Sequence, residues 1–294
     1  MRNGAEEQPV NIAETTGYPI REFARLTGVN PVTLRAWERR YGIIQPLRTP
    51  KGHRYYTDDH VDQVKSILYW LDQGYPIRQV KLLLNEPPAD PARASDDWEQ
   101  LQNRQLSAAR DLNSRALDDE WSNGLASYPM GVYYERCLLP VLDTLRQSPD
   151  EALILHAYSH LLQRKLTQLV QLQQKHAEGP GLLMCTNDPQ AELHVLAASY
   201  ALGAAGFRLE YFGVNLNPDD VRIVSDRLDF SWVWAHIHPS NSDEQQQWQA
   251  LSDKCRIPVY FSGAIPKTTA EDYALKPPMN KQIQTFITHA GGFA

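Results

Sequence analysis

The chain has 294 residues, of which 42% are hydrophobic, enough for two or three modest domains with cores of their own. Its formal net charge of -6 gives no sign of a nucleic-acid partner, yet residues 17–86 hold eleven Lys and Arg against seven Asp and Glu. A basic module is therefore joined to an acidic remainder. Because DNA affinity depends on local positive charge, the whole-chain charge does not exclude DNA binding.

The cysteines and the first residues indicate the cellular compartment. Cys137, Cys185 and Cys255 lie far apart, without the spacing of a zinc site or a disulfide framework. Residues 1–16 are polar and acidic with no apolar core, so we expect a disordered leader and not a signal peptide. No segment approaches the roughly 18 apolar residues of a membrane span. These features predict a soluble cytoplasmic protein without membrane contact.

Two short helices joined by a turn open the basic module. An apolar stripe begins at Ile20, and Gly28 is placed to end the first helix as its C-cap. Asn30 before Pro31 is an N-cap followed by a proline at the first helical position, so a second helix is expected from there to Gly42. This pattern is typical of a helix-turn-helix.

A basic and aromatic hairpin, or wing, follows the second helix. Two short strands flank a turn that contains Gly52, and two further apolar-striped helices complete the module. A proline-rich segment then separates the module from the rest of the chain. The expected ranges are 45–56 for the wing, 57–74 and 77–84 for the helices, and 87–97 for the linker.

The second helix and the wing carry the residues expected to contact DNA. Arg35 and Arg39 are four apart and share a helix face, and Thr33 in the first turn is placed to reach base edges in the major groove. Trp37 is expected to be a core anchor. The alternative is an ordinary solvated charged face, but the capped helix, the turn and the wing occur together. The predicted DNA-binding residues are Asn30, Thr33, Arg35, Arg39, Arg40, Tyr41, Arg48, Lys51, His53, Arg54 and Tyr55.

Residues 98–178 show a helical period throughout. Leucines at helical spacing mark apolar faces over 138–145 and 162–172, which predicts a small four-helix bundle. Breaks between its helices are expected at 122–124, 128–129 and 148–150.

From residue 179 the period changes to short apolar runs that alternate with helical segments. This alternation predicts a mostly parallel, doubly wound α/β domain over 179–294, similar to a Rossmann fold. The chain as a whole is therefore predicted to be an α+β multidomain protein: a winged helix-turn-helix over 17–86, the bundle over 98–178 and the α/β domain. The expected strands are 182–186, 209–214, 232–237 and 259–261, with a fifth near Tyr273.

The segment Asn30-Pro31-Val32-Thr33-Leu34-Arg35-Ala36-Trp37-Glu38-Arg39-Arg40-Tyr41-Gly42, with Gly52-His53-Arg54-Tyr55, resembles the MerR family of bacterial transcription regulators. Within that family it resembles the branch of the MlrA, CarH and LitR regulators. The resemblance implies a winged helix that binds inverted repeats in double-stranded promoter DNA. It also implies a homodimer or higher homo-oligomer, with RNA polymerase as an indirect partner. Whether the protein activates or represses is left open.

The same branch carries a bundle and a cobalamin-binding domain, and residues 98–294 resemble that pair. The resemblance implies that His194 is the lower ligand of cobalt, with Glu192 as the acceptor that orients its ring. Ala197 stands where the family has a glycine. His160 falls at the position of the histidine that caps the upper face of cobalt, while Pro149 replaces the family's tryptophan.

Two further positions depart from the family pattern. Its Ser-x-Leu strand end is replaced by Ala235-His236-Ile237-His238, and its Gly-Gly turn by Ser262-Gly263. Because His236 and His238 alternate along a strand, they are expected to share a face and to line a polar pocket with His194. The candidate cofactor-binding residues are His160, Glu192, His194, Ser262 and Gly263.

Two hypotheses of regulation follow. In the first, the protein is a MerR-type regulator with a degenerate cobalamin site. In the alternative, cobalamin binds at His194 and makes the regulator responsive to corrinoid or light. An enzyme is not expected, because residues 98–294 show no nucleophile with a base, no paired carboxylates and no Gly-rich phosphate loop.

Overall fold

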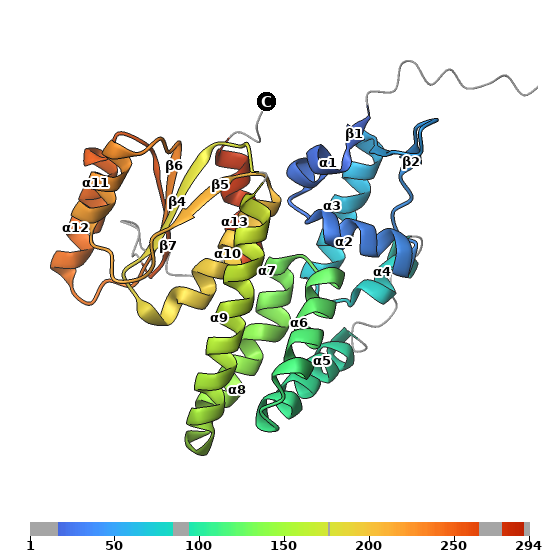
Figure 1. The fold of residues 1–294 in the computed structure, drawn as a ribbon, viewed down its shortest axis with the longest axis horizontal. Helices are drawn as coiled ribbons and strands as arrows, with labels where there is room; N and C mark the ends of the chain where they lie inside the picture. Colours follow the sequence, from blue (N-terminus) through green and yellow to red (C-terminus); the bar gives the residue numbers. More distant parts are fainter. Residues whose placement is uncertain (1–16, 85–93, 176, 265–277, 291–294) are drawn as a thin grey trace, which may run out of the picture.

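The computed structural model describes residues 17–84, 94–175, 177–264 and 278–290. In chain order these residues form a small winged domain, a helical bundle and an α/β domain, which follow one another from blue to red in Figure 1. Among the residues described, no helix is both long and apolar enough to cross a membrane.

The helix-turn-helix is present as predicted. Helix α1 (Ile20–Thr27) ends at Gly28, whose φ of 68° lies in the left-handed region that glycine tolerates. The Asn30 side chain accepts the N–H of Val32 and so caps α2 (Pro31–Ala36). The second helix then continues as a π-helical turn, Trp37–Tyr41, a wider turn than the sequence predicted.

The wing contains one strand more than expected. Strands β1 (Tyr18–Pro19), β3 (Arg54–Tyr56) and β2 (Leu47–Arg48) form an antiparallel sheet in that order, and the sequence had predicted only the last two. Tyr56 stacks on Phe23 of α1 at 4.1 Å between ring centroids, which fixes the wing to the helices. Helices α3 (Asp58–Asp72) and α4 (Ile77–Leu83) complete the domain.

The bundle has the predicted breaks at 128–129 and 148–150, but the break at 122–124 is wrong. Helix α6 runs through that segment. Gly124 does not end the helix but lets it pack closely on the Tyr133 ring, which a Cβ at this position would overlap. The actual break lies before α6, where Leu112 has a φ of 49° and the Asn113 side chain caps the helix. Helix α5 also begins inside the predicted linker. The bundle helices are α5 (Ala94–Arg110), α6 (Ser114–Ser127), α7 (Met130–Tyr133), α8 (Leu139–Gln147) and α9 (Ala152–Gln174), with a π-helical turn, Tyr134–Leu138, between α7 and α8.

The α/β domain contains the predicted four parallel strands in the order β5-β4-β6-β7. The chain leaves β4 for β5 on one side and then returns for β6 on the other, so the topological switch point lies between β4 and β6. In Figure 1, α10 and α13 cover one face of the sheet, and α11 and α12 cover the other. The fifth strand expected near Tyr273 lies outside the described residues.

The elements of this domain alternate as the sequence predicted. Only the second strand is shorter than expected. Their bounds are β4 (Gly181–Thr186), α10 (Glu192–Ala204), β5 (Arg208–Tyr211), α11 (Pro218–Arg227), β6 (Trp232–Ile237), α12 (Ser242–Lys254), β7 (Val259–Gly263) and α13 (Met279–His289).

Candidate nucleic-acid interface and ligand site

The second helix and the wing are tied together by one carboxylate. Glu38, in the π-helical turn, accepts hydrogen bonds from Arg54 Nε at 2.6 Å and from Arg48 Nη2 at 3.1 Å. The hydrogen bond to Glu38 raises the pKa of the Arg54 guanidinium. Sequence reasoning missed Glu38, because an acid among arginines gives no sign of which of them it pairs with.

Most of the predicted contact residues lie at least partly exposed on the second helix and the wing. Their charge is positive, and guanidinium groups can pair with phosphate oxygens in a bidentate way. The arrangement can therefore hold a polyanion. Exposed members are Arg39, Arg40, Arg48, Lys51 and His53, and half-buried members are Arg35, Arg54 and Tyr55.

The opposite side of the second helix is covered by the rest of the protein. Thr33 is 1% exposed, and its hydroxyl donates to the Leu125 carbonyl of α6 at 3.0 Å. Asn30 donates from Nδ2 to the hydroxyl of Tyr200 in α10 at 3.2 Å. In this conformation one side of the first turn of α2 faces protein while Val32 on the other side is exposed, and base contact by Thr33 stays a prediction that requires the winged domain to leave α6.

The end of the second helix also forms hydrogen bonds with α6 of the bundle. Trp37, the predicted core anchor, is fully buried, and its indole Nε1 donates to the Ser127 carbonyl at 2.8 Å. The Tyr41 hydroxyl donates to Ser127 Oγ at 3.0 Å. The segment at the end of α6 is thus bonded to both aromatic residues.

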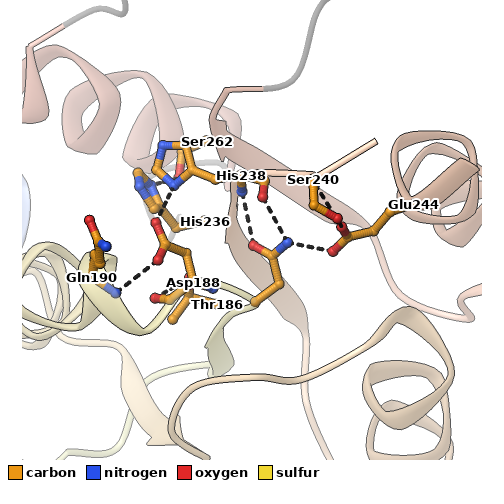
Figure 2. A network of polar contacts seen from close by, with 9 residues as sticks. Thr186, Asp188, Gln190, His236, His238, Ser240, Glu244 and Ser262 are labelled. Atoms are coloured by element: carbon orange, nitrogen blue, oxygen red, sulfur yellow. Dashed lines mark hydrogen bonds and ion pairs between the residues drawn. The ribbon is translucent and has the colours of Figure 1, made fainter. Parts of the chain in front are cut away.

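At the carboxyl ends of the parallel strands the structure brings the three predicted histidines together. His194, in the first turn of α10, lies with its ring centroid 4.2 Å from that of His236 at the end of β6. The rings of His236 and His238 are 5.0 Å apart, and His238 Nδ1 lies 3.0 Å from Asp188 Oδ2. Figure 2 shows the contact of Asp188 with His238 beside the hydrogen bond of His236 to Ser262.

The ends of β4 and β6 are bridged by the protein's own side chains. Asn187 accepts the N–H of His238 at 2.9 Å and donates to its carbonyl at 3.1 Å, as a neighbouring strand would. Asn187 Nδ2 also donates to Glu244. The Glu244 carboxylate in turn accepts from the N–H and hydroxyl of Ser240, and Figure 2 shows these two residues side by side. These bonds from Ser240 and Asn187 lower the pKa of Glu244 to about 2. This network pairs its polar groups without a ligand.

The residues at this site do not fit a cobalamin. The ring of His194 packs against His236 and lies in a T-shaped contact with Tyr134 of the bundle at 5.4 Å, so two aromatic neighbours stand beside the imidazole that would have to bind cobalt. Ala197 is fully buried, so its methyl group lies inside the core where the family has glycine. Ser262 Oγ accepts the indole N–H of Trp234 and bonds to His236.

The other candidate cofactor residues are placed elsewhere or serve other contacts. His160 is exposed on α9 and lines a groove of about 800 Å³ with residues of α6 and α9, so it does not face His194. Glu192 lies beside the Tyr211 hydroxyl, where burial and that carboxylate raise the pKa of Tyr211. Gly263 has a φ of 95° and closes β7 against Ile237. Within the described ranges, no group of three or more His, Cys, Asp or Glu side chains is arranged to hold a metal ion.

The chain is similar to known proteins over the winged domain and over most of the residues that follow it. Residues 18–87 match the model of the MerR HTH family regulatory proteins. The HTH-type transcriptional regulator MlrA of Escherichia coli is 25% identical over 233 residues, covering 79% of this chain and 94% of that protein. The HTH-type transcriptional repressor CarH of Myxococcus xanthus is 28% identical, covering 87% of this chain and 92% of its own.

The similarity to a third relative is high enough to show the family of this chain. The HTH-type transcriptional repressor CarA of Myxococcus xanthus is 30% identical over 205 residues, which cover 67% of this chain and 68% of that protein. The similarity thus continues past the winged domain into the bundle and the α/β domain. The chain belongs to the MerR family of helix-turn-helix transcriptional regulators.

Proposed function

We propose that this protein regulates transcription by binding specific double-stranded DNA with its second helix and its wing. The observation that supports the proposal is the pairing of Arg48 and Arg54 of the wing with Glu38 of the second helix, on a module whose Arg39, Arg40, Lys51 and His53 are exposed. Helix contacts read base edges and wing contacts hold the phosphates. A homodimer or higher homo-oligomer on an inverted repeat suits this module, with RNA polymerase affected indirectly.

The α/β domain, on this proposal, has the fold of a cobalamin sensor without retaining cobalamin. This proposal is supported by the contact of His194 with His236 and Tyr134, and by the bridge that Asn187 makes between the ends of β4 and β6. Such a domain regulates through its contacts with the bundle and the winged domain. The second candidate function, a cobalamin-dependent regulator, is favoured only by the position of His194.

A binding experiment tests the DNA part of the proposal. Fluorescence anisotropy of a labelled duplex from the protein's own upstream region, against a scrambled duplex of equal length, should show tighter binding to the first. Equal affinity for the two duplexes at matched salt would remove the claim of sequence specificity.

A separate experiment tests the ligand part. The purified protein is mixed with adenosylcobalamin in the dark and desalted, and its absorption spectrum is recorded. We expect no bound corrinoid. Stoichiometric retention that is lost in His194→Ala would establish the second candidate instead.

A further inference from the structure

The winged domain meets the other two parts at one polar junction at the end of α3. Asp72, the last residue of α3, accepts a hydrogen bond from Asn280 Nδ2 of α13 at 2.9 Å. Its backbone carbonyl accepts from Arg136 Nη2 of the bundle at 2.6 Å. Glu135 Oε1 of the bundle in turn accepts the N–H of Met279 at the start of α13 at 2.7 Å. Three parts of the chain are thus joined through four side chains.

Helix α13 is closely fitted at this junction. Asn280 is 7% exposed, and a Cβ on Gly131 of α7 would lie 2.8 Å from the Asn280 Cα, so the two backbones are in close contact. Further along the helix, Gln284 and Ile287 lie next to Gly28 in the turn between α1 and α2. Figure 1 shows α13 beside α1. One helix of the α/β domain therefore contacts the winged domain at both of its ends.

The junction holds the winged domain in the position in which Asn30 and Thr33, at the start of its second helix, are covered. Recognition helices place their first turn in the major groove, and here Thr33 of that turn is covered by α6 and the capping Asn30 is bonded to α10, while Val32 stays exposed. DNA contact by Thr33 and Asn30 requires these two hydrogen bonds to break and the domain to move off the bundle. The contacts of Asp72 oppose that movement.

We propose that the Asp72–Asn280 pair is a latch through which α13 keeps the DNA-binding domain docked in an inhibited position. Movement of α13 in the α/β domain releases the latch, and the winged domain then leaves α6 and can enter the groove. Asp72 and Asn280 are positioning residues and do not touch DNA. The inference rests on the proposed use of the second helix for DNA binding.

Exchange of charge across the pair tests the latch in the full-length protein. Asn280→Asp places two carboxylates in the contact now made by one, so their repulsion opposes docking. The double variant Asp72→Asn with Asn280→Asp restores an amide–carboxylate hydrogen bond in the reverse direction. Asn241→Asp is a matched control, because Asn241 is an exposed N-cap where aspartate serves equally well.

Two readouts separate the latch from the DNA proposal. In hydrogen–deuterium exchange without DNA, we expect Asn280→Asp to lose protection in α2 and at the end of α6, and the double variant to regain it. We expect Asn280→Asp to bind the upstream duplex about fivefold more tightly, at the low end of usual allosteric couplings, with the double variant returning to the wild-type affinity.

Several outcomes would overturn the latch. Protection of α2 that is unchanged in Asn280→Asp, or equal in Asn280→Asp and Asn241→Asp, contradicts it. If Asn280→Asp fails to fold, rescue by the double variant supports the pair, and a double variant that also fails refutes it. Loss of protection without any gain in specific affinity would confirm docking through the pair but reject its inhibitory role. Failure of DNA binding in the wild type would instead reject the proposed function.

Discussion

The basic surface of the winged domain and the strand-end site of the α/β domain use polar residues in opposite ways. Around Glu38, arginines are gathered at the surface, and several predicted contact residues are exposed to solvent. At the strand ends, Asn187, Asp188 and Glu244 pair with groups of the protein itself. The first region leaves charged side chains open to solvent, whereas the named groups of the second are paired within the protein. A shared ancestral fold therefore says less about ligand binding than the pairing of each polar group does.

The largest effect is expected from removal of a predicted base-reading arginine. We expect Arg35→Ala to weaken binding to the upstream duplex by about 1–3 kcal/mol, and to weaken non-specific binding less. Anisotropy titrations with specific and scrambled duplexes measure both. Lys65→Ala, on the exposed face of α3, serves as the control for loss of one positive charge. Unchanged binding by Arg35→Ala would show that this face of the helix is not the one that reads DNA.

Removal of the bridge that Asn187 makes between the ends of β4 and β6 should lower the stability of the protein without changing its ligand binding. Asn187→Ala leaves both backbone groups of His238 and one oxygen of Glu244 without their partner, so we expect a loss of roughly 1–2 kcal/mol in the free energy of unfolding. Urea denaturation measures the loss, with exposed Gln246→Ala as the control. A gain of corrinoid binding in Asn187→Ala, without loss of stability, would mean that the bridge only occludes a working site.

The carboxylate between helix and wing should control specificity. Glu38→Gln frees Arg48 and Arg54 to pair with any phosphate, so non-specific affinity should rise while the wing is held less firmly. We expect the difference in binding free energy between specific and non-specific DNA to shrink by roughly 1 kcal/mol. Glu22→Gln, which removes an ion pair on α1, is the matched control. An unchanged difference would mean that the pairing with Glu38 has no part in recognition.

The smallest effect is expected from an exposed wing lysine. Lys51→Ala should weaken specific and non-specific binding alike, by less than about 1 kcal/mol, and reduce the slope of log affinity against log salt by about 1. Titrations at several salt concentrations measure the slope. A loss confined to the specific duplex would reassign Lys51 from phosphate contact to base contact.

Local patterns in the sequence predicted the elements that depend on local chemistry. The Asn30 cap, the Gly28 terminus and the alternation of strands and helices after residue 179 are all present in the structure. These features depend on the backbone preferences of a few adjacent residues. The candidate histidines at the strand ends were likewise predicted to meet, because parallel strands end at one edge.

The features that sequence reasoning missed depend on contacts between distant residues. Gly124 indicated a break, but it makes room for the Tyr133 ring nine residues later. The bond of the Thr33 hydroxyl to Leu125, in another part of the chain, was not predicted, while contact of Thr33 with a base edge stays a prediction. Nothing near Glu38 in sequence shows that it pairs with the wing. Such pairings are set by tertiary packing, and periodicity does not report them.

One measurement tests the central claim, that the DNA surface functions while the strand-end site holds no cobalamin. The affinity of the pure protein for its own upstream duplex is measured with and without adenosylcobalamin, in the dark and after illumination. We expect specific binding with the same affinity in all four conditions. Specific binding that depends on adenosylcobalamin or on light would show that the strand-end site holds a working corrinoid sensor.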